Sequence, residues 1–163
     1  MGSNTPSAGR LYEDFSEGAV YRHWPGRTIS ETDNTWFTLL TMNTHPLHFD
    51  QKYAAGTRFG RPLVNSCLTL SVVVGMSVRD VSQAAIANLG FESIELPAPV
   101  HNGDTLYATS TVLEKRVSRS NPLQGIVRVK TIGTNQQGDE VLRLVRSVLV
   151  PLRSPVDGDR TAH

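Results

Sequence analysis

The chain has 163 residues, of which 39% are hydrophobic, and a formal net charge of +1 at pH 7. This length and composition suit one domain with an ordinary core, and the charge gives no general attraction to nucleic acid or to an anionic membrane. Arg79 and Asp80 end the longest apolar run before it reaches the ~18 residues of a membrane span. The single cysteine, Cys67, can form no intramolecular disulfide, which is typical of a reducing compartment, so we expect a cytoplasmic protein.

Local composition defines the two ends of the chain and the first helix. Residues 1–10 and 154–163 are rich in Ser, Pro, Gly, Asp and Arg, so we expect disordered tails around a folded domain at 11–153. Ser30-Glu31-Thr32-Asp33 has the form of a capping box, which predicts that a helix begins there. One side of this helix carries a cluster of four apolar residues, Trp36, Phe37, Leu39 and Leu40.

A turn rich in polar side chains follows this helix. It reads Thr41-Met42-Asn43-Thr44-His45-Pro46-Leu47-His48-Phe49-Asp50, and so places a carboxamide, two imidazoles and a carboxylate around one proline. Proline restricts its own backbone and biases the preceding residue toward an extended conformation. The polar side chains are therefore held by a stiff turn, as an acid/base site requires. From the residues alone, the two histidines could equally be hydrogen-bonding loop residues, and Asn43 could cap the turn.

The rest of the chain predicts one long helix and several strands. Residues 63–81 are apolar on nearly all sides, which predicts a buried helix, and Ser66, Ser71 and Gly75 form a small-residue stripe where a sheet could approach closely. Asn121-Pro122 and 135–139 have the composition of hairpin turns, so the last three strands should form an antiparallel meander. The strand signals cover residues 86–96, 105–118, 124–134 and 140–152.

Two segments resemble a known family. The turn at 41–50 resembles the signature Leu-Thr-Gly-Asp-x-Asn-Pro-(apolar)-His-x-Asp of MaoC-like dehydratases and (R)-specific enoyl-CoA hydratases, and 96–106 resembles their Pro-Val-x-x-Gly-Asp-Thr-Leu segment. The resemblance covers roughly residues 15–152. It implies an α+β fold: a single hotdog domain in which an antiparallel sheet wraps around a long buried helix. It also implies a homodimer, or a dimer of dimers, with active sites at the subunit interface.

The family pattern assigns roles to residues of the turn and of the helix start. His48 falls on the catalytic histidine, whereas Asn43 stands where the family has its catalytic aspartate. His45 replaces an asparagine of the pattern, and Met42 replaces a glycine. The family stretch Pro-Ile-x-His-Gly aligns with 62–66, so the backbone amide of Ser66 is the expected oxyanion donor and Asn65 could add a side-chain donor.

The implied reaction is the reversible hydration of a 2-enoyl-CoA to a 3-hydroxyacyl-CoA thioester. Histidine exchanges protons near neutral pH, which suits His48 as the base. Asn43 can position water but cannot act as a general acid or base. Three alternatives therefore remain: His48 acting with His45, His48 acting alone, or a binding protein without catalysis. Asp50 could contact substrate, orient a histidine or cap the next segment.

Basic residues are candidates for binding the substrate. Arg58 and Arg61 flank Phe59-Gly60, close to the expected end of the acyl group, and would suit a substrate with its own carboxylate. Arg119, with its basic neighbours on the same hairpin, could hold the phosphates of coenzyme A, although an ordinary solvated face is an equal explanation. The segments 118–122 and 125–127 resemble a subgroup associated with itaconyl-, mesaconyl- or methylmalyl-CoA.

Other functions stay open on this fold. They are a dehydratase for acyl chains on a carrier protein, a thioesterase, and a non-catalytic dimer that binds acyl-CoA. We expect no cofactor beyond the coenzyme A of the substrate. We also expect no metal, because His45-x-x-His48 is a weak ligand spacing with no third ligand suggested.

Overall fold

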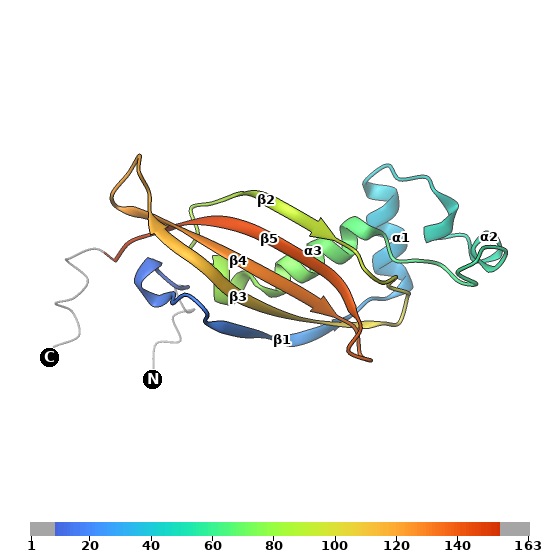
Figure 1. The fold of residues 1–163 in the computed structure, drawn as a ribbon. Coiled ribbons are helices and arrows are strands. Elements are labelled where there is room, and N and C mark those ends of the chain that lie inside the picture. The colour runs from blue at the N-terminus through green and yellow to red at the C-terminus, as the bar shows by residue number, and fades with distance from the viewer. Residues whose placement is uncertain (1–8, 154–163) are drawn as a thin grey trace, which may run out of the picture.

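Five antiparallel strands form one sheet in the computed structural model, which describes residues 9–153 (Figure 1). The strands lie side by side in the order β1-β3-β4-β5-β2, so the predicted meander of the last three strands is confirmed. Their bounds are β1 Val20–Thr28, β2 Ala87–Glu95, β3 Thr105–Val117, β4 Gln124–Thr134 and β5 Glu140–Pro151. The predicted tails at 1–8 and 154–163 lie outside the described residues. Arg10, expected in the N-terminal tail, instead donates hydrogen bonds to Asp80 and so joins the folded part.

β1 is a strand that the sequence analysis did not predict. It lies at one edge of the sheet and pairs with β3, and its register shifts between His23 and Arg27. Pro25 lies inside this interval and has no backbone N–H to donate to a neighbouring strand. An edge position tolerates the interruption, because only one side of the strand is paired. The proline therefore prevented prediction of this strand from the sequence, although the rest of its pairing is regular.

α1 (Glu31–Leu40) begins at the predicted capping box. The Ser30 hydroxyl accepts a hydrogen bond from the Asp33 backbone N–H at 3.0 Å, and the Asp33 carboxylate accepts one from the Ser30 N–H at 2.9 Å. These bonds from Ser30 lower the pKa of the Asp33 carboxyl. The apolar cluster on this helix lies largely at the surface of the chain: Trp36 is 65% exposed, and its neighbours Leu39 and Leu40 are exposed too.

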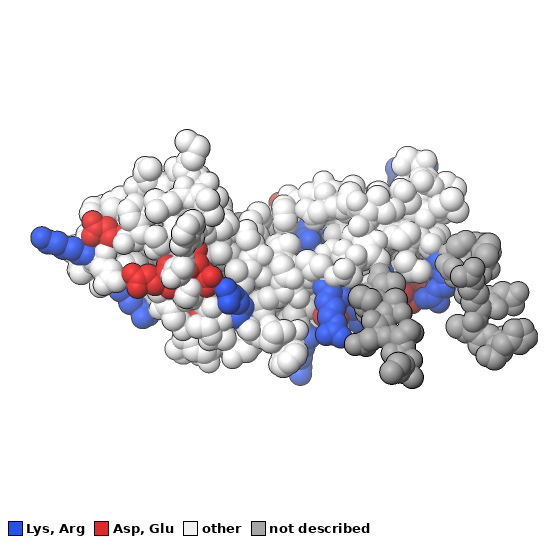
Figure 2. Space-filling model, turned by 180° about the vertical axis from the view of Figure 1, so that it is seen from behind, with Lys and Arg blue, Asp and Glu red and all other residues white. Residues whose placement is uncertain are grey.

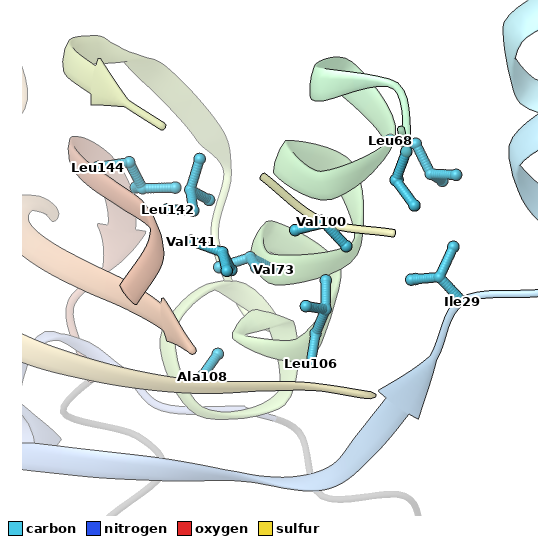
Figure 3. Packing of buried hydrophobic residues seen from close by; sticks show 10 residues of the cluster. Ile29, Leu68, Val73, Val100, Leu106, Ala108, Val141, Leu142 and Leu144 are labelled. Atoms are coloured by element: carbon cyan, nitrogen blue, oxygen red, sulfur yellow. The ribbon is translucent and has the colours of Figure 1, made fainter. Parts of the chain in front are cut away.

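The predicted buried helix is confirmed as α3 (Ser66–Met76), which continues into the π-helical turn η3 (Val78–Ser82). Figure 3 shows its apolar side chains packed with residues of the sheet, including Val73 beside Leu142 and Val141. The small-residue stripe faces away from the sheet, contrary to expectation. Helix and sheet approach closely at Gly133 of β4, where an added Cβ would lie 2.7 Å from the Val73 side chain. The small residue that permits close packing is therefore in the strand.

A row of buried polar residues crosses the helix-facing side of the sheet and separates two apolar clusters. The His23 imidazole bonds to the Ser110 hydroxyl at 2.8 Å, and Ser110 bonds to the Thr131 hydroxyl at 2.7 Å. On β5, the buried Arg146 guanidinium donates to the Ser77 hydroxyl at 2.9 Å. Burial lowers the pKa of Arg146. Hydrogen bonding thus compensates for burying His23, Ser110 and Thr131 in the core, and compensates in part for Arg146, whose buried Nε has no hydrogen-bond partner among the described residues.

Candidate active site

The polar turn lies beside α1, at one end of the sheet (Figure 1). It forms the short helical turn η2 (Pro46–His48) and leads into α2 (Gln51–Ala55), neither of which the sequence analysis predicted. Met42 has a φ of 59°, in the left-handed region that favours glycine, the residue type that the family pattern has at this position. The Asn43 carboxamide oxygen accepts a hydrogen bond from the His45 N–H at 3.0 Å. Asn43 therefore caps the turn, which is one of the roles expected for it from the sequence.

The ring of His48 is oriented by a backbone carbonyl from the segment before α3. Its Nδ1 lies 3.0 Å from the Leu63 carbonyl oxygen. Because a carbonyl only accepts, Nδ1 carries the proton, and the neutral ring has its lone pair on Nε2. This is the protonation pattern that a general base needs. The carbonyl partner lies outside the turn, so the local motif did not reveal it.

The neighbouring imidazole has the opposite pattern. The Nδ1 of His45 accepts a hydrogen bond from the Leu47 backbone N–H at 3.1 Å, so Nδ1 has no proton and the neutral ring carries one on Nε2. The ring centroids of His45 and His48 are 6.0 Å apart. One imidazole thus offers a proton acceptor and the other a hydrogen-bond donor on the same turn.

The start of α3, three residues after the Leu63 carbonyl that binds His48, supplies backbone donors. The Ser66 amide occupies the first helical position, where N–H groups have no intrahelical partner and favour an anion. Asn65 differs from its expected role as a substrate donor. Its carboxamide oxygen caps the helix by accepting from the Cys67 N–H at 2.9 Å, and its amide nitrogen lies 3.3 Å from the Thr38 hydroxyl. The residue is only 4% exposed, and both polar atoms of its side chain are engaged within the chain.

A cavity of about 290 Å³ lies against the start of α3. Its lining includes Arg58, Phe59, Leu63, Ser66, Thr69 and the loop at 96–100. The Arg58 guanidinium carbon lies 4.7 Å above the centre of the Phe59 ring. Arg61 is exposed and is not among the lining residues, so the structure distinguishes two arginines that the sequence analysis treated alike.

Of two other predicted substrate contacts, one caps a helix and the other lies at a different end of the sheet. The Asp50 carboxylate accepts a hydrogen bond from the Tyr53 N–H at 2.9 Å and caps α2, which was one of its three expected roles. Arg119 follows β3, in the connection to β4. This hairpin lies at the opposite end of the sheet from α1 and α2 (Figure 1). Within one chain, the structure does not bring Arg119 to the imidazoles.

Asn34 is a site residue that the sequence analysis missed. It lies on the buried side of α1, is 0% exposed, and its amide nitrogen donates to the carbonyl oxygens of His48 and Leu63, each at 2.9 Å. An asparagine inside a helix has no distinctive local pattern. The available signal was its i, i+4 spacing to Thr38, which is also buried.

A second constellation resembles a hydrolase triad. Asp80 bonds to His23 at 2.9 Å, and His23 bonds to Ser110 at 2.8 Å. The Ser110 side chain is 0% exposed within the core, so no substrate reaches it, and this cluster does not support the thioesterase alternative. Within residues 9–153, no group of three His, Cys, Asp or Glu side chains is arranged to hold a metal ion, and no helix is long and apolar enough to cross a membrane.

Several known proteins are similar to this chain in sequence. The family model of the MaoC like domain matches residues 14–135. Mesaconyl-CoA hydratase from Cereibacter sphaeroides is 36% identical over 147 residues, which cover 90% of this chain and 43% of that protein. Beta-methylmalyl-CoA dehydratase from Chloroflexus aurantiacus is 35% identical over 147 residues, which cover 90% and 42% of the two chains.

The fold has a counterpart among solved structures. A conserved Mycobacterium tuberculosis protein with a double hotdog fold matches with a TM-score of 0.81 and 25% identity, over 93% of this chain and 46% of that one. The chain therefore spans less than half the length of all three of these proteins. The matched family domain, the sheet wrapped around α3 and the histidine turn lead to one assignment: the chain belongs to the MaoC-like dehydratase family and forms a hotdog domain.

Proposed function

We propose that this domain carries the site for reversible hydration of a 2-enoyl-CoA thioester. The observation that supports it most is the hydrogen bond from His48 Nδ1 to the Leu63 carbonyl. This bond leaves Nε2 available as a base, and it ties the ring to Leu63, which lies three residues before Ser66 in the sequence. Base and oxyanion donor are thereby held by one short connection. Coenzyme A enters as part of the substrate and no separate cofactor is required.

The proposed steps conserve atoms and charge. His48 Nε2 takes a proton from water, and the water oxygen forms a bond to C3 of the enoyl group. The double-bond electrons move to the thioester oxygen, where the N–H of Ser66 stabilises the enolate. His48 then returns the proton to C2, so that one water is added overall. His45 donates a hydrogen bond from Nε2 to the attacking water; it does not supply the proton, because its Nδ1 is occupied by the Leu47 N–H and a neutral ring is a poor acid.

A spectrophotometric assay tests this proposal. Purified protein is mixed separately with crotonyl-CoA, mesaconyl-CoA, itaconyl-CoA and a crotonyl chain on a carrier protein, and loss or gain of the conjugated thioester absorbance is followed. Turnover of any of them supports a hydratase. Turnover restricted to crotonyl chains on a carrier protein would favour the carrier-linked dehydratase. Binding by calorimetry without turnover would instead identify a non-catalytic acyl-CoA binding domain.

We further propose that the substrate carries a short dicarboxylic acyl group. Its free carboxylate would bind Arg58 in the cavity at the start of α3. The relatives named above act on mesaconyl-CoA and β-methylmalyl-CoA, which fits a cation at this position. Arg58→Ala should lower kcat/KM for mesaconyl-CoA by roughly 10- to 150-fold more than for crotonyl-CoA, from the ~1.5–3 kcal/mol of a charged hydrogen bond.

Arg61→Ala is the matched control, because it removes the same charge from an exposed residue outside the lining. It should affect both substrates alike and only slightly. An equal loss on both substrates for Arg58→Ala would assign this arginine to coenzyme A binding or to structure, and would remove it from acyl recognition.

We also propose that a second copy of this chain pairs along β2. This strand is the other edge of the sheet, with exposed apolar side chains that include Leu89, Ile94 and Phe91, the last 41% exposed. Figure 2 shows few charged side chains along the upper margin of the molecule, the margin that β2 forms in Figure 1. The two carboxylates of this strand, Glu92 and Glu95, pair with Arg128 and Arg143 of the same chain. An edge strand with exposed apolar side chains invites pairing, and the double hotdog relative contains two units in one chain. Sedimentation velocity should give a dimer; a monomer at micromolar concentration would contradict the pairing.

A further inference from the structure

Asn34 connects three separate segments around the proposed site. Its amide nitrogen lies 2.9 Å from the carbonyl oxygens of His48 and Leu63 and 3.1 Å from the carboxamide oxygen of Asn102. Its own carboxamide oxygen accepts a hydrogen bond from the Asn65 N–H at 2.9 Å. The residue is completely buried, so water does not substitute for these partners.

One carbonyl links Asn34 to the orientation of the catalytic ring. The Leu63 oxygen accepts from the Asn34 amide at 2.9 Å and from the His48 Nδ1 at 3.0 Å. Asn34 also holds the backbone of the His48 residue itself. Both ends of the ring's hydrogen bond are thus tied to the same amide, and loss of that amide would let the ring and its acceptor move independently.

The opposite side of the same amide sets the start of α3. Its oxygen holds the N–H of Asn65, the residue directly before the Ser66 amide. Only a carboxamide of this length donates to carbonyls on one side and accepts from an N–H on the other. Aspartate keeps the acceptor but loses the donors, and leucine removes the partner of both the His48 carbonyl and the Asn65 N–H.

We propose that Asn34 is the positioning residue that keeps His48 in the Nδ1–H tautomer and sets its placement relative to the Ser66 amide. Its effect on rate rests on the proposed hydratase function, whereas its effect on the tautomer does not. A positioning role lowers kcat more than it weakens binding, because the substrate still enters the same cavity while the reacting groups are misplaced.

The experiment compares Asn34→Ala with Asn135→Ala. Asn135 is also buried and also makes side-chain hydrogen bonds, but its partners, Gln137 and Asp139, lie in its own turn between β4 and β5. Asn34→Ala should lower kcat by about 10- to 100-fold with KM changed less than about threefold. Long-range ¹H–¹⁵N spectra of the imidazoles, assigned by comparison with His48→Gln, should show loss of the single Nδ1–H form of His48. Asn135→Ala should retain both the kcat and the spectrum of the parent.

Two further outcomes decide the proposal. If Asn34→Ala does not fold, Asn34→Asp takes its place, since it preserves volume and the acceptor for the Asn65 N–H while removing the donors. A folded variant that keeps the Nδ1–H form of His48 overturns the proposal, as does one whose kcat matches Asn135→Ala. If the parent protein hydrates no enoyl-CoA, the hydratase proposal fails by itself, and the imidazole spectra alone decide the role of Asn34.

Discussion

Replacing His48 with alanine is expected to lower kcat/KM for enoyl-CoA hydration by 10²- to 10⁴-fold, the usual contribution of a general base. The loss follows from removing Nε2, the proton acceptor that the Leu63 carbonyl leaves unprotonated. The fold should survive, because His48 is only partly buried and its side chain makes one hydrogen bond, which contributes about 1 kcal/mol. Urea unfolding of the variant measures this second expectation.

His48→Asn is the matched variant for this test. The asparagine amide reaches the position of Nδ1, so it can still donate to the Leu63 carbonyl, but it has no basic nitrogen in place of Nε2. It should be as inactive as the alanine variant. Activity within about threefold of the parent in either variant would remove His48 from the mechanism.

His45→Asn is expected to lower kcat/KM by about 10²-fold, the cost of removing one hydrogen-bond donor from a reacting group. His45→Gln should recover much of this loss, because its amide N–H reaches further along the direction of Nε2. Recovery would identify His45 as a neutral donor. Equal losses in both variants, with a new pH dependence, would identify it as a proton donor. A His45→Asn protein with parental kcat/KM would leave His48 acting alone.

Asn43→Asp completes this series. A carboxylate at this position can still accept from the His45 N–H, so the turn should be retained. We expect a neutral or harmful effect, because His45 and His48 already fill the two roles and the variant adds a charge beside them. Increased activity on simple enoyl-CoAs would show instead that the aspartate-dependent mechanism of the family persists here in weakened form. The double variant with His45→Asn measures the coupling between the two positions.

Local patterns were sufficient for most of the fold. The capping box at 30–33, the all-round apolar run before η3 and the turn residues between the last strands act within a few residues of each other, so they can be read directly. β1 was not predicted, because Pro25 interrupts the local strand pattern. Only its pairing with β3 shows that the strand continues past this proline.

The face that α1 presents to the core was decided by tertiary structure. Periodicity indicated an apolar side, but the fully buried residues are Asn34 and Thr38. Of the apolar cluster, Phe37 packs against the core, whereas Trp36, Leu39 and Leu40 are exposed in the single chain. A hydrophobic pattern predicts that a helix face is buried against another surface. It does not indicate whether that surface belongs to the same chain or to another one. Buried polar residues lack the apolar periodicity that identifies a core-facing side, and the partners of Asn34 are backbone groups of other segments.

The same division applies to the site. The family motif pointed to His48 from the sequence, yet its tautomer depends on a carbonyl fifteen positions away, at Leu63. The separation of Arg58 from Arg61, and the distance of the Arg119 hairpin from the turn, likewise follow from how α1, α3 and the sheet pack. Residue types and local spacing specify which chemistry is available. The contacts between distant segments specify which atoms of those residues face the reaction, because hydrogen bonds from across the fold select the ring orientation and proton position.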